Sequence, residues 1–382
     1  MIRAPVFILL ILGQVLGLSF GAYAQEQEDT VLRRTIAQKI IVGFFGQKNT
    51  DPDFRRLLKN LEQGIVGGVL FLGRNISSKT DLETMVREVK NCKCSVLPLI
   101  AIDEEGGIIE RLGESQGFSH TPSAAEVGND SEERARANYG RLANKLSEIG
   151  FNMNLAPVVD LNLNPTNPII GRLGRSFSSS PQTVSRYASI FIEEHHKRGI
   201  ATALKHFPGH GSSSIDSHDA IANVEASWLP VELVPYENLI GMDIVDGVMV
   251  GHLLNASRWG GAATQDDSKA IEQMLRQELK FDGVVLSDDL SMKGVRSTTQ
   301  LFSEVINSSV RAGVDIVIVS RLNDNDETSD IGNYANSAIL NGVLAGEINR
   351  VSIATSVERI ELLRKEIADS FSSRKQTKTN KN

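Results

Sequence analysis

Short apolar runs alternate with longer amphipathic segments along most of the chain. Eight of the short runs lack a regular alternation of apolar and polar residues, as expected of parallel strands buried on both faces. These predicted strands are Ile40–Phe45, Gly68–Leu72, Pro98–Ile102, Asn152–Val159, Thr202–Phe207, Gly247–His252, Gly283–Ser287 and Asp315–Val319.

A helix-like stretch follows each predicted strand. The eight stretches are Asp53–Gln63, Lys79–Asn91, Ser131–Ile149, Pro181–Arg198, Pro235–Met242, Asp267–Leu279, Thr299–Ala312 and Ile331–Leu344. An opening helix, Thr30–Lys39, and a closing helix, Ile353–Ile367, bracket the set. Eight repeats of strand and helix favour an α/β fold of the (β/α)8 barrel type, in a single domain, over an open doubly wound sheet.

The N-terminal segment, residues 1–24, has the layout of a secretory signal peptide. Met1–Arg3 carries one positive charge, Val6–Phe20 is almost continuously apolar, and Ala22–Ala24 fits a small-x-small cleavage site. A membrane anchor is the alternative, but the apolar run is short for crossing a bilayer. We therefore expect cleavage, export to the periplasm or the exterior, and no stable membrane insertion afterwards.

Composition narrows the class of protein. The 382 residues include 47 acidic and 40 basic side chains, a formal net charge of −7. An acidic chain without a concentrated basic patch is a poor candidate for binding nucleic acid. We assign residues 25–370 to the barrel domain and the Lys-rich residues 371–382 to a disordered tail. Cys92 and Cys94 are expected to be two thiols near a buried strand, because a disulfide across one residue would be strained.

Five adjacent predicted strands end in charged or imidazole side chains. Because the carboxyl ends of barrel strands meet at one rim, where the active sites of such barrels lie, we expect a functional cluster there. The endings, in strand order, are Asp103-Glu104-Glu105, Asp160, Lys205 to His210, His252, and Asp288-Asp289.

The most distinctive segment runs from Lys205 to His218. A strand end leads into a Gly/Ser-rich loop that can move over a site, and the loop returns Asp216 two residues before His218. Asp216 can orient the His218 imidazole. Metal binding by these side chains with His206 and His210 competes, but Lys205 would repel a cation and the helical spacing of zinc motifs is absent. A loop held only by structural hydrogen bonds is the third interpretation.

At these residues the chain resembles glycoside hydrolase family 3, in particular its single-domain β-N-acetylhexosaminidases. The similarity covers roughly residues 30–345, in the family's order. The matching segments are Asp103-Glu-Glu-Gly-Gly through Arg111, Ala156-Pro-Val-Val-Asp160, Arg175-Ser-Phe177, Lys205-His-Phe-Pro-Gly-His-Gly211, Asp216-Ser-His218 and Phe281-Asp-Gly-Val-Val-Leu-Ser-Asp-Asp-Leu-Ser-Met292.

The resemblance implies a retaining exo-β-N-acetylglucosaminidase that works through a glycosyl-aspartate intermediate. It implies Asp288 as the nucleophile and His218 as the general acid and base, oriented by Asp216. The positions that match residues binding the terminal sugar are Asp103, Arg111, Arg175, Lys205 and His206. It requires no metal and no organic cofactor, and a monomer is expected.

The chemistry of retention explains these residue types. Two groups about 5–5.5 Å apart must protonate the leaving oxygen and attack the anomeric carbon. An imidazole titrates near neutrality, so His218 can give a proton and take it back, while basic neighbours would lower the pKa of Asp288. Asp289 is expected to be structural. A β-N-acetylglucosaminide phosphorylase and an inactive sugar-binding protein are the alternatives. The expected substrate is a peptidoglycan fragment or a chitooligosaccharide, and a glycan from another organism stays open.

Overall fold

The computed structural model describes residues 26–216, 221–263, 269–293, 295, 301–321 and 329–379, with side chains described as far as residue 370. Eight parallel strands close into a barrel in the order β1-β11-β10-β7-β5-β4-β3-β2. All eight overlap the predicted strands, which confirms the (β/α)8 fold. They are β1 Ile40–Val42, β2 Gly68–Phe71, β3 Leu99–Ile102, β4 Met153–Asn154, β5 Ala201–Phe207, β7 Gly247–Val250, β10 Val284–Asp289 and β11 Ile316–Val319.

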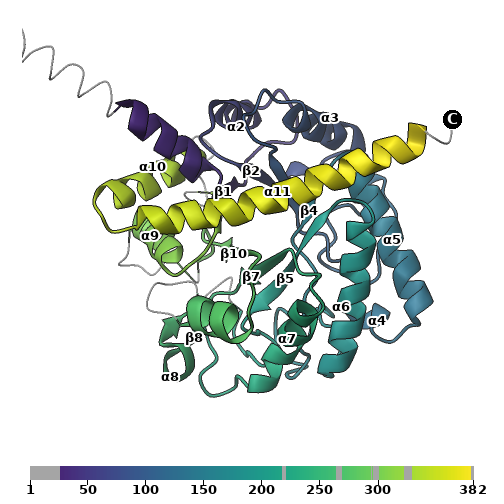
Figure 1. Ribbon diagram of the computed structural model, residues 1–382. Helices are drawn as coiled ribbons and strands as arrows, with labels where there is room; N and C mark the ends of the chain where they lie inside the picture. The colour runs from purple at the N-terminus through teal and green to yellow at the C-terminus, as the bar shows by residue number, and fades with distance from the viewer. Residues whose placement is uncertain are drawn as a thin grey trace, which may run out of the picture.

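Helices surround the barrel on its outer face (Figure 1). They are α2 Pro52–Gln63, α3 Lys79–Lys90, α5 Glu132–Ile149, α6 Pro181–His196, α7 Val234–Gly241, η4 Ala270–Glu278, α9 Phe302–Arg311 and α10 Ile331–Leu344, preceded by a helix over residues 26–37. Serine N-caps fix three of the starts: Ser78, Ser131 and Ser180 each accept a hydrogen bond from a backbone N–H of the first turn. The sequence predicted an ordinary helix for η4, which is instead a π-helix.

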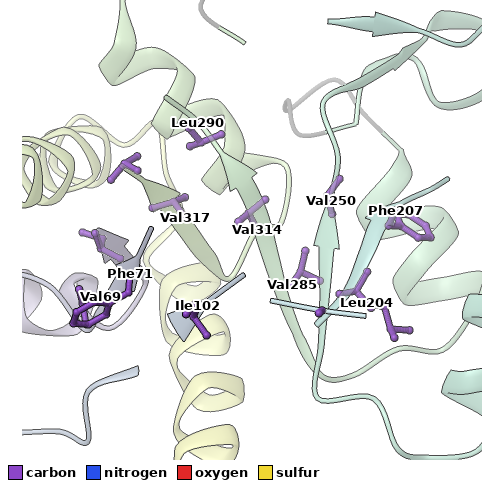
Figure 2. Packing of buried hydrophobic residues seen from close by; sticks show 14 of the residues in the cluster. Val69, Phe71, Ile102, Leu204, Phe207, Val250, Val285, Leu290, Val314 and Val317 are labelled. Atoms are coloured by element: carbon purple, nitrogen blue, oxygen red, sulfur yellow. The ribbon is translucent and has the colours of Figure 1, made fainter. Parts of the chain in front are cut away.

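Alternation along the strands divides the core into two layers. Val69, Phe71 and Val317 belong to the layer between strands and helices, part of which Figure 2 shows. Leu70 and Ile318 belong to a second cluster that draws residues from every barrel strand. Only the inside of the barrel can bring these residues together, so the barrel is a packed core and not a channel.

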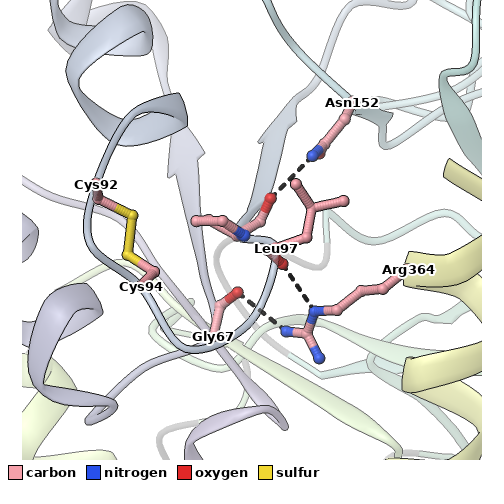
Figure 3. The surroundings of a disulfide bond; sticks show 7 residues. Gly67, Cys92, Cys94, Leu97, Asn152 and Arg364 are labelled. Atoms are coloured by element: carbon pink, nitrogen blue, oxygen red, sulfur yellow. Dashed lines mark hydrogen bonds between the residues drawn. A yellow bond between two sulfur atoms is a disulfide. The ribbon is translucent and has the colours of Figure 1, made fainter. Parts of the chain in front are cut away.

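Helix α11, Arg350–Thr379, closes the end of the barrel at which the strands begin (Figure 1). Its Ile360, Leu363 and Ile367 pack against the interior cluster. Its Arg364 side chain donates hydrogen bonds to the carbonyl oxygens of Gly67 and Leu97, just before β2 and β3, at 3.1 and 2.9 Å (Figure 3). The carboxyl ends of the strands therefore form the opposite rim, where the polar residues were predicted.

The closing helix is longer than the sequence suggested. Its backbone remains helical to Thr379, within residues 371–382, which we had assigned to a disordered tail. The segment from 371 to 379 contains neither Gly nor Pro, so nothing in it breaks a helix that is already formed.

Cys92 and Cys94 form a disulfide in the turn between α3 and β3 (Figure 3). The prediction of two free thiols is therefore wrong. The turn places the two Cα atoms 5.3 Å apart, which is within the separation that a disulfide needs. Sequence separation alone did not reveal this, because the distance depends on how the backbone turns.

Several short elements at the loops escaped the sequence analysis because two to four residues carry no readable periodicity. Three strands form a small separate sheet: β6 Ala222–Asn223, β8 Leu253–Asn255 and β9 Gly261–Ala262. The short helices are η1 Gly73–Asn75, η2 Glu114–Gln116, α4 Ala124–Val127, η3 Pro230–Leu233 and α8 Ala256–Trp259. Within the described part of the chain, no helix has the length and apolar character needed to span a bilayer.

Candidate active site

Two barrel strands change register where they carry candidate residues. Between Leu204 and Phe207, β5 advances three residues while β7 advances two, so the irregularity falls at Lys205 and His206. In β10 the same shift lies between Leu286 and Asp289, opposite β11. Such an extra residue redirects side chains without ending the strand. The sequence thereby presents Lys205, His206 and Asp288 at the rim.

Lys205 lies at the centre of a buried ion-pair network. Its Nζ is 2.8 Å from Asp103 Oδ1 and 2.7 Å from Glu105 Oε1. Arg175 donates two hydrogen bonds to the same Glu105 carboxylate, from Nε and Nη2, both at 2.8 Å. The structure therefore brings together three of the predicted sugar-binding residues, Asp103, Arg175 and Lys205. It adds Glu105, which was not predicted although it stands in the acidic run after β3.

The network keeps its members charged despite burial. Burial alone would lower the pKa of Lys205, but the Asp103 and Glu105 carboxylates outweigh it and raise that pKa above its ordinary value. Burial would also raise the pKa of Glu105, yet Arg175 and Lys205 bring it far below its usual range. Each charge is thus stabilised by its neighbours, as expected of a buried, fully paired cluster.

A second cluster centres on Asp160, at the end of the predicted fourth strand. Its carboxylate lies 2.7 Å from His206 Nδ1 and accepts the backbone N–H groups of His206 and His210. Burial opposes ionisation of Asp160, but the adjacent imidazoles lower its pKa overall. Because Nδ1 of His206 points at Asp160, its Nε2 is the ring nitrogen that remains for a ligand. Asp160 was noted as a strand ending but was not predicted as a site residue.

The end of β10 holds the predicted nucleophile. Asp288 Oδ1 accepts a hydrogen bond of 2.7 Å from the Asp289 N–H. The side chain of Asp289 turns away and accepts the N–H groups of Ser291 and Ser320 at 2.9 and 3.1 Å, which confirms its predicted structural role. His252, which follows β7, has its Nε2 3.2 Å from the Asp289 carbonyl oxygen. Its pKa is lowered by burial, against which the Asp288 charge acts. This places His252 near the candidate nucleophile.

The remaining predicted residues are placed less completely. Arg111 is held through its backbone N–H, which donates to Glu104 Oε2 at 2.6 Å, and its buried Nε has no hydrogen-bond partner among the described residues. Asp216 is described and half-buried. His218 lies in the segment 217–220, outside the described residues, so the predicted carboxylate–imidazole pair stays a prediction. Among the described residues, no three His, Cys, Asp or Glu side chains form a group suited to a metal ion.

Taken together, the rim offers a buried, hydrogen-bonded set of donors and acceptors and, at the end of β10, a carboxylate. The ammonium of Lys205 and the guanidinium of Arg175 can donate to hydroxyl or carbonyl oxygens, while Asp103 and, in the neutral ring, Nε2 of His206 can accept from hydroxyls. Asp288 supplies a nucleophilic oxygen. This set suits an uncharged, oxygen-rich ligand that is attacked at carbon.

Comparison with known proteins agrees with this chemistry. The model of the glycosyl hydrolase family 3 N-terminal domain matches residues 31–363. A β-hexosaminidase of Idiomarina loihiensis is 34% identical over 269 residues, 68% of this chain and 78% of that protein. A second β-hexosaminidase, from Photobacterium profundum, is 32% identical over 266 residues, 68% of this chain and 76% of that one.

Solved structures show the same relationship. A family 3 β-N-acetylglucosaminidase from Paenibacillus superposes with a TM-score of 0.78 at 30% identity, over 88% of this chain and 62% of the Paenibacillus chain. This chain thus spans less than two thirds of that protein. A β-N-acetylhexosaminidase from Beutenbergia cavernae gives a TM-score of 0.75 at 25% identity, over 87% and 98% of the two chains. The fold, the rim residues and these matches lead to one conclusion: the chain belongs to glycoside hydrolase family 3.

Proposed function

We propose that this protein is a retaining exo-β-N-acetylglucosaminidase that removes terminal, β-linked N-acetylglucosamine from peptidoglycan fragments or chitooligosaccharides. The observation that carries the proposal is the buried Asp103–Lys205–Glu105–Arg175 network on the rim that also holds Asp288. A fixed set of donors and acceptors facing a single carboxylate is what cleavage of a hydroxyl-rich sugar requires. The names of the related β-hexosaminidases point to the same substrate class.

In the proposed reaction, Asp288 attacks the anomeric carbon while His218 donates a proton to the departing glycosidic oxygen. The bond from carbon to the leaving oxygen breaks, and an ester forms between the sugar and Asp288. His218, now neutral, takes a proton from water, which attacks the same carbon and releases Asp288 as a carboxylate. Asp216 orients His218, and Lys205, Arg175, Asp103, Arg111 and His206 hold the sugar.

One experiment tests the reaction class. An aryl β-N-acetylglucosaminide is incubated with the protein, with and without inorganic phosphate, and the first-formed product is followed by NMR. We expect free sugar in the β configuration under both conditions. Release of a sugar 1-phosphate would indicate phosphorolysis, and the α anomer would exclude retention.

The nucleophile is tested by the variant Asp288→Ala, for which we expect loss of turnover to the background rate. The variant Asp289→Asn is the matched control, because it changes the adjacent carboxylate, which holds the backbone of Ser291 and Ser320. An active Asp288→Ala protein would mean that another group attacks the sugar.

We also propose that the protein is exported and acts outside the cytoplasm on cell-wall fragments. The proposal rests on the signal-like segment 1–24. N-terminal sequencing of the protein from its native host should give a start near Gln25 in the extracytoplasmic fraction. A cytoplasmic protein that retains Arg3 would contradict it.

A further inference from the structure

We propose that Glu232 is a positioning residue of the acid–base loop: its carboxylate fixes the segment that leads from β5 to Asp216 and His218. This inference rests on the proposed function, in which that segment delivers a proton to the leaving oxygen. Glu232 itself lies in η3, outside the polar strand endings at the rim, and is 1% exposed.

The contacts of Glu232 converge on the loop. Oε2 accepts the backbone N–H of Gly211 at 2.9 Å and that of Ser212 at 3.4 Å. Oε1 accepts the Ser212 hydroxyl at 2.6 Å and, from its own element, the Leu229 N–H at 3.4 Å. Both oxygens of one buried carboxylate therefore hold two consecutive loop residues by backbone and side chain.

The loop is shaped to receive this carboxylate. Gly209 has a φ of +124°, and a Cβ there would lie 2.5 Å from the Cβ of Glu232. A Cβ on Gly211 would lie 1.8 Å from the carbonyl oxygen of Leu161. Any other residue at either position would push the loop off Glu232 or off the barrel, so the two glycines permit the close approach.

Local hydrogen bonds also hold the residues between this anchor and Asp216. Next to Ser212, the Ser213 hydroxyl accepts from the Ile215 N–H at 3.1 Å and donates to the Ile215 carbonyl at 3.0 Å. The Asn164 side chain donates to the Ser213 carbonyl at 3.0 Å. Asp216 follows directly. A shift of the Glu232 anchor therefore moves the start of the segment that is proposed to carry the proton.

Burying the Glu232 carboxylate has a desolvation cost, which argues against an incidental role for this residue. Burial raises the pKa of Glu232 to about 7, although the Ser212 hydrogen bond acts in the opposite direction. A neutral side chain of similar shape would fill the space at lower cost in desolvation. A neutral side chain, however, lacks the acceptor capacity of the carboxylate, which can accept all four of these hydrogen bonds.

The test compares Glu232→Gln with the wild type on two substrates that differ in leaving group. Chitobiose needs its leaving oxygen protonated, whereas 2,4-dinitrophenyl β-N-acetylglucosaminide does not. The ratio kcat/KM is measured for both, because it reports steps only up to the first bond cleavage. General acid catalysis contributes about 10²–10⁴-fold, so partial misplacement should lower kcat/KM for chitobiose roughly 10–100-fold. The dinitrophenyl substrate should lose less than about threefold, because it makes no use of that acid.

Two further variants decide the outcome. Ser212→Ala removes only the 2.6 Å hydroxyl bond, and we expect the same selective loss at smaller size, even if Glu232→Gln fails to fold. Asp246→Asn is the matched control: Asp246 accepts the N–H and hydroxyl of Thr202 at 2.8 and 2.9 Å, at the opposite end of β5. It should leave the ratio between the two substrates unchanged.

An equal loss on both substrates, or no loss, in folded Glu232→Gln or Ser212→Ala would overturn the inference while leaving the proposed function intact. A wild-type protein that cleaves neither substrate would instead refute the proposed function.

Discussion

Replacing Glu105 by Gln probes the buried network directly. Glu105 is 7% exposed. Its carboxylate accepts two hydrogen bonds of 2.8 Å from Arg175 and forms an ion pair of 2.7 Å with Lys205. Glutamine keeps the shape but leaves two buried cations with only Asp103 as a carboxylate partner in this network. Breaking one partner of a buried ion pair costs about 3–5 kcal/mol, so we expect a loss of that size in the free energy of unfolding.

The effect of Glu105→Gln on the free energy of unfolding should depend on pH in a predictable direction. The folded pKa of Glu105 lies well below its ordinary value of 4.5, so its contribution is complete above about pH 5.5 and declines as the pH falls through 4.5. By linkage, the advantage of the wild type over Glu105→Gln should shrink by roughly 1 kcal/mol between pH 7 and pH 4. Urea unfolding followed by circular dichroism at both pH values measures it.

The neighbouring Glu104 provides a control of opposite sign. It is fully buried and bound to Lys145, but burial outweighs that partner and raises its pKa. Its ionisation is therefore unfavourable to the fold, and the stability of the wild type relative to Glu104→Gln should fall as the pH rises through the raised pKa. If both variants showed the same pH trend, or if Glu105→Gln cost less than about 1 kcal/mol, the account of the network would be wrong.

Three further predictions follow from single contacts. Asp160→Asn removes the carboxylate that fixes His206 Nδ1 and should raise KM for an aryl glycoside about tenfold, with a smaller change in kcat, as steady-state kinetics can show. Replacing Cys92 and Cys94 together by Ser should cost about 1–2 kcal/mol in urea unfolding, a small effect because the closed loop is short. Tyr139→Phe should stabilise the protein by about 1 kcal/mol, because the buried hydroxyl has no hydrogen-bond partner among the described residues; a destabilised variant would point to a bound water.

The sequence predicted the barrel well because its signals are repeated and local. Each strand is a short run buried on both faces, and errors at its ends do not alter the count of eight. The residues at the strand ends were predicted for a related reason: in a parallel barrel, the last residues of all strands lie at the same rim. Asp103 and Lys205, from two such strand endings, accordingly lie in one network, which Arg175, indicated only by the family resemblance, also joins.

What escaped prediction depends on contacts between distant segments. Glu104 and Glu105 are adjacent in sequence, yet one faces Lys145 and the other faces Lys205 and Arg175, and no local pattern distinguishes them. Glu232 reaches its partners across about twenty residues of intervening chain. The sequence also suggested that Lys205 and Arg175 would lower the pKa of Asp288. In the structure both cations pair with the other carboxylates, those of Asp103 and Glu105.

The pairing of these charges bears on what the site can recognise. Lys205 and Arg175 are matched by Asp103 and Glu105, so this network has little net charge left to attract an ion. A sugar hydroxyl needs directional donors and acceptors and no net charge. Because each polar group is already held by a charged neighbour, it need not reorganise when the sugar arrives, and the cost of ordering the site is met in folding and not in binding. The same contacts that stabilise the barrel rim therefore prepare it for an uncharged ligand.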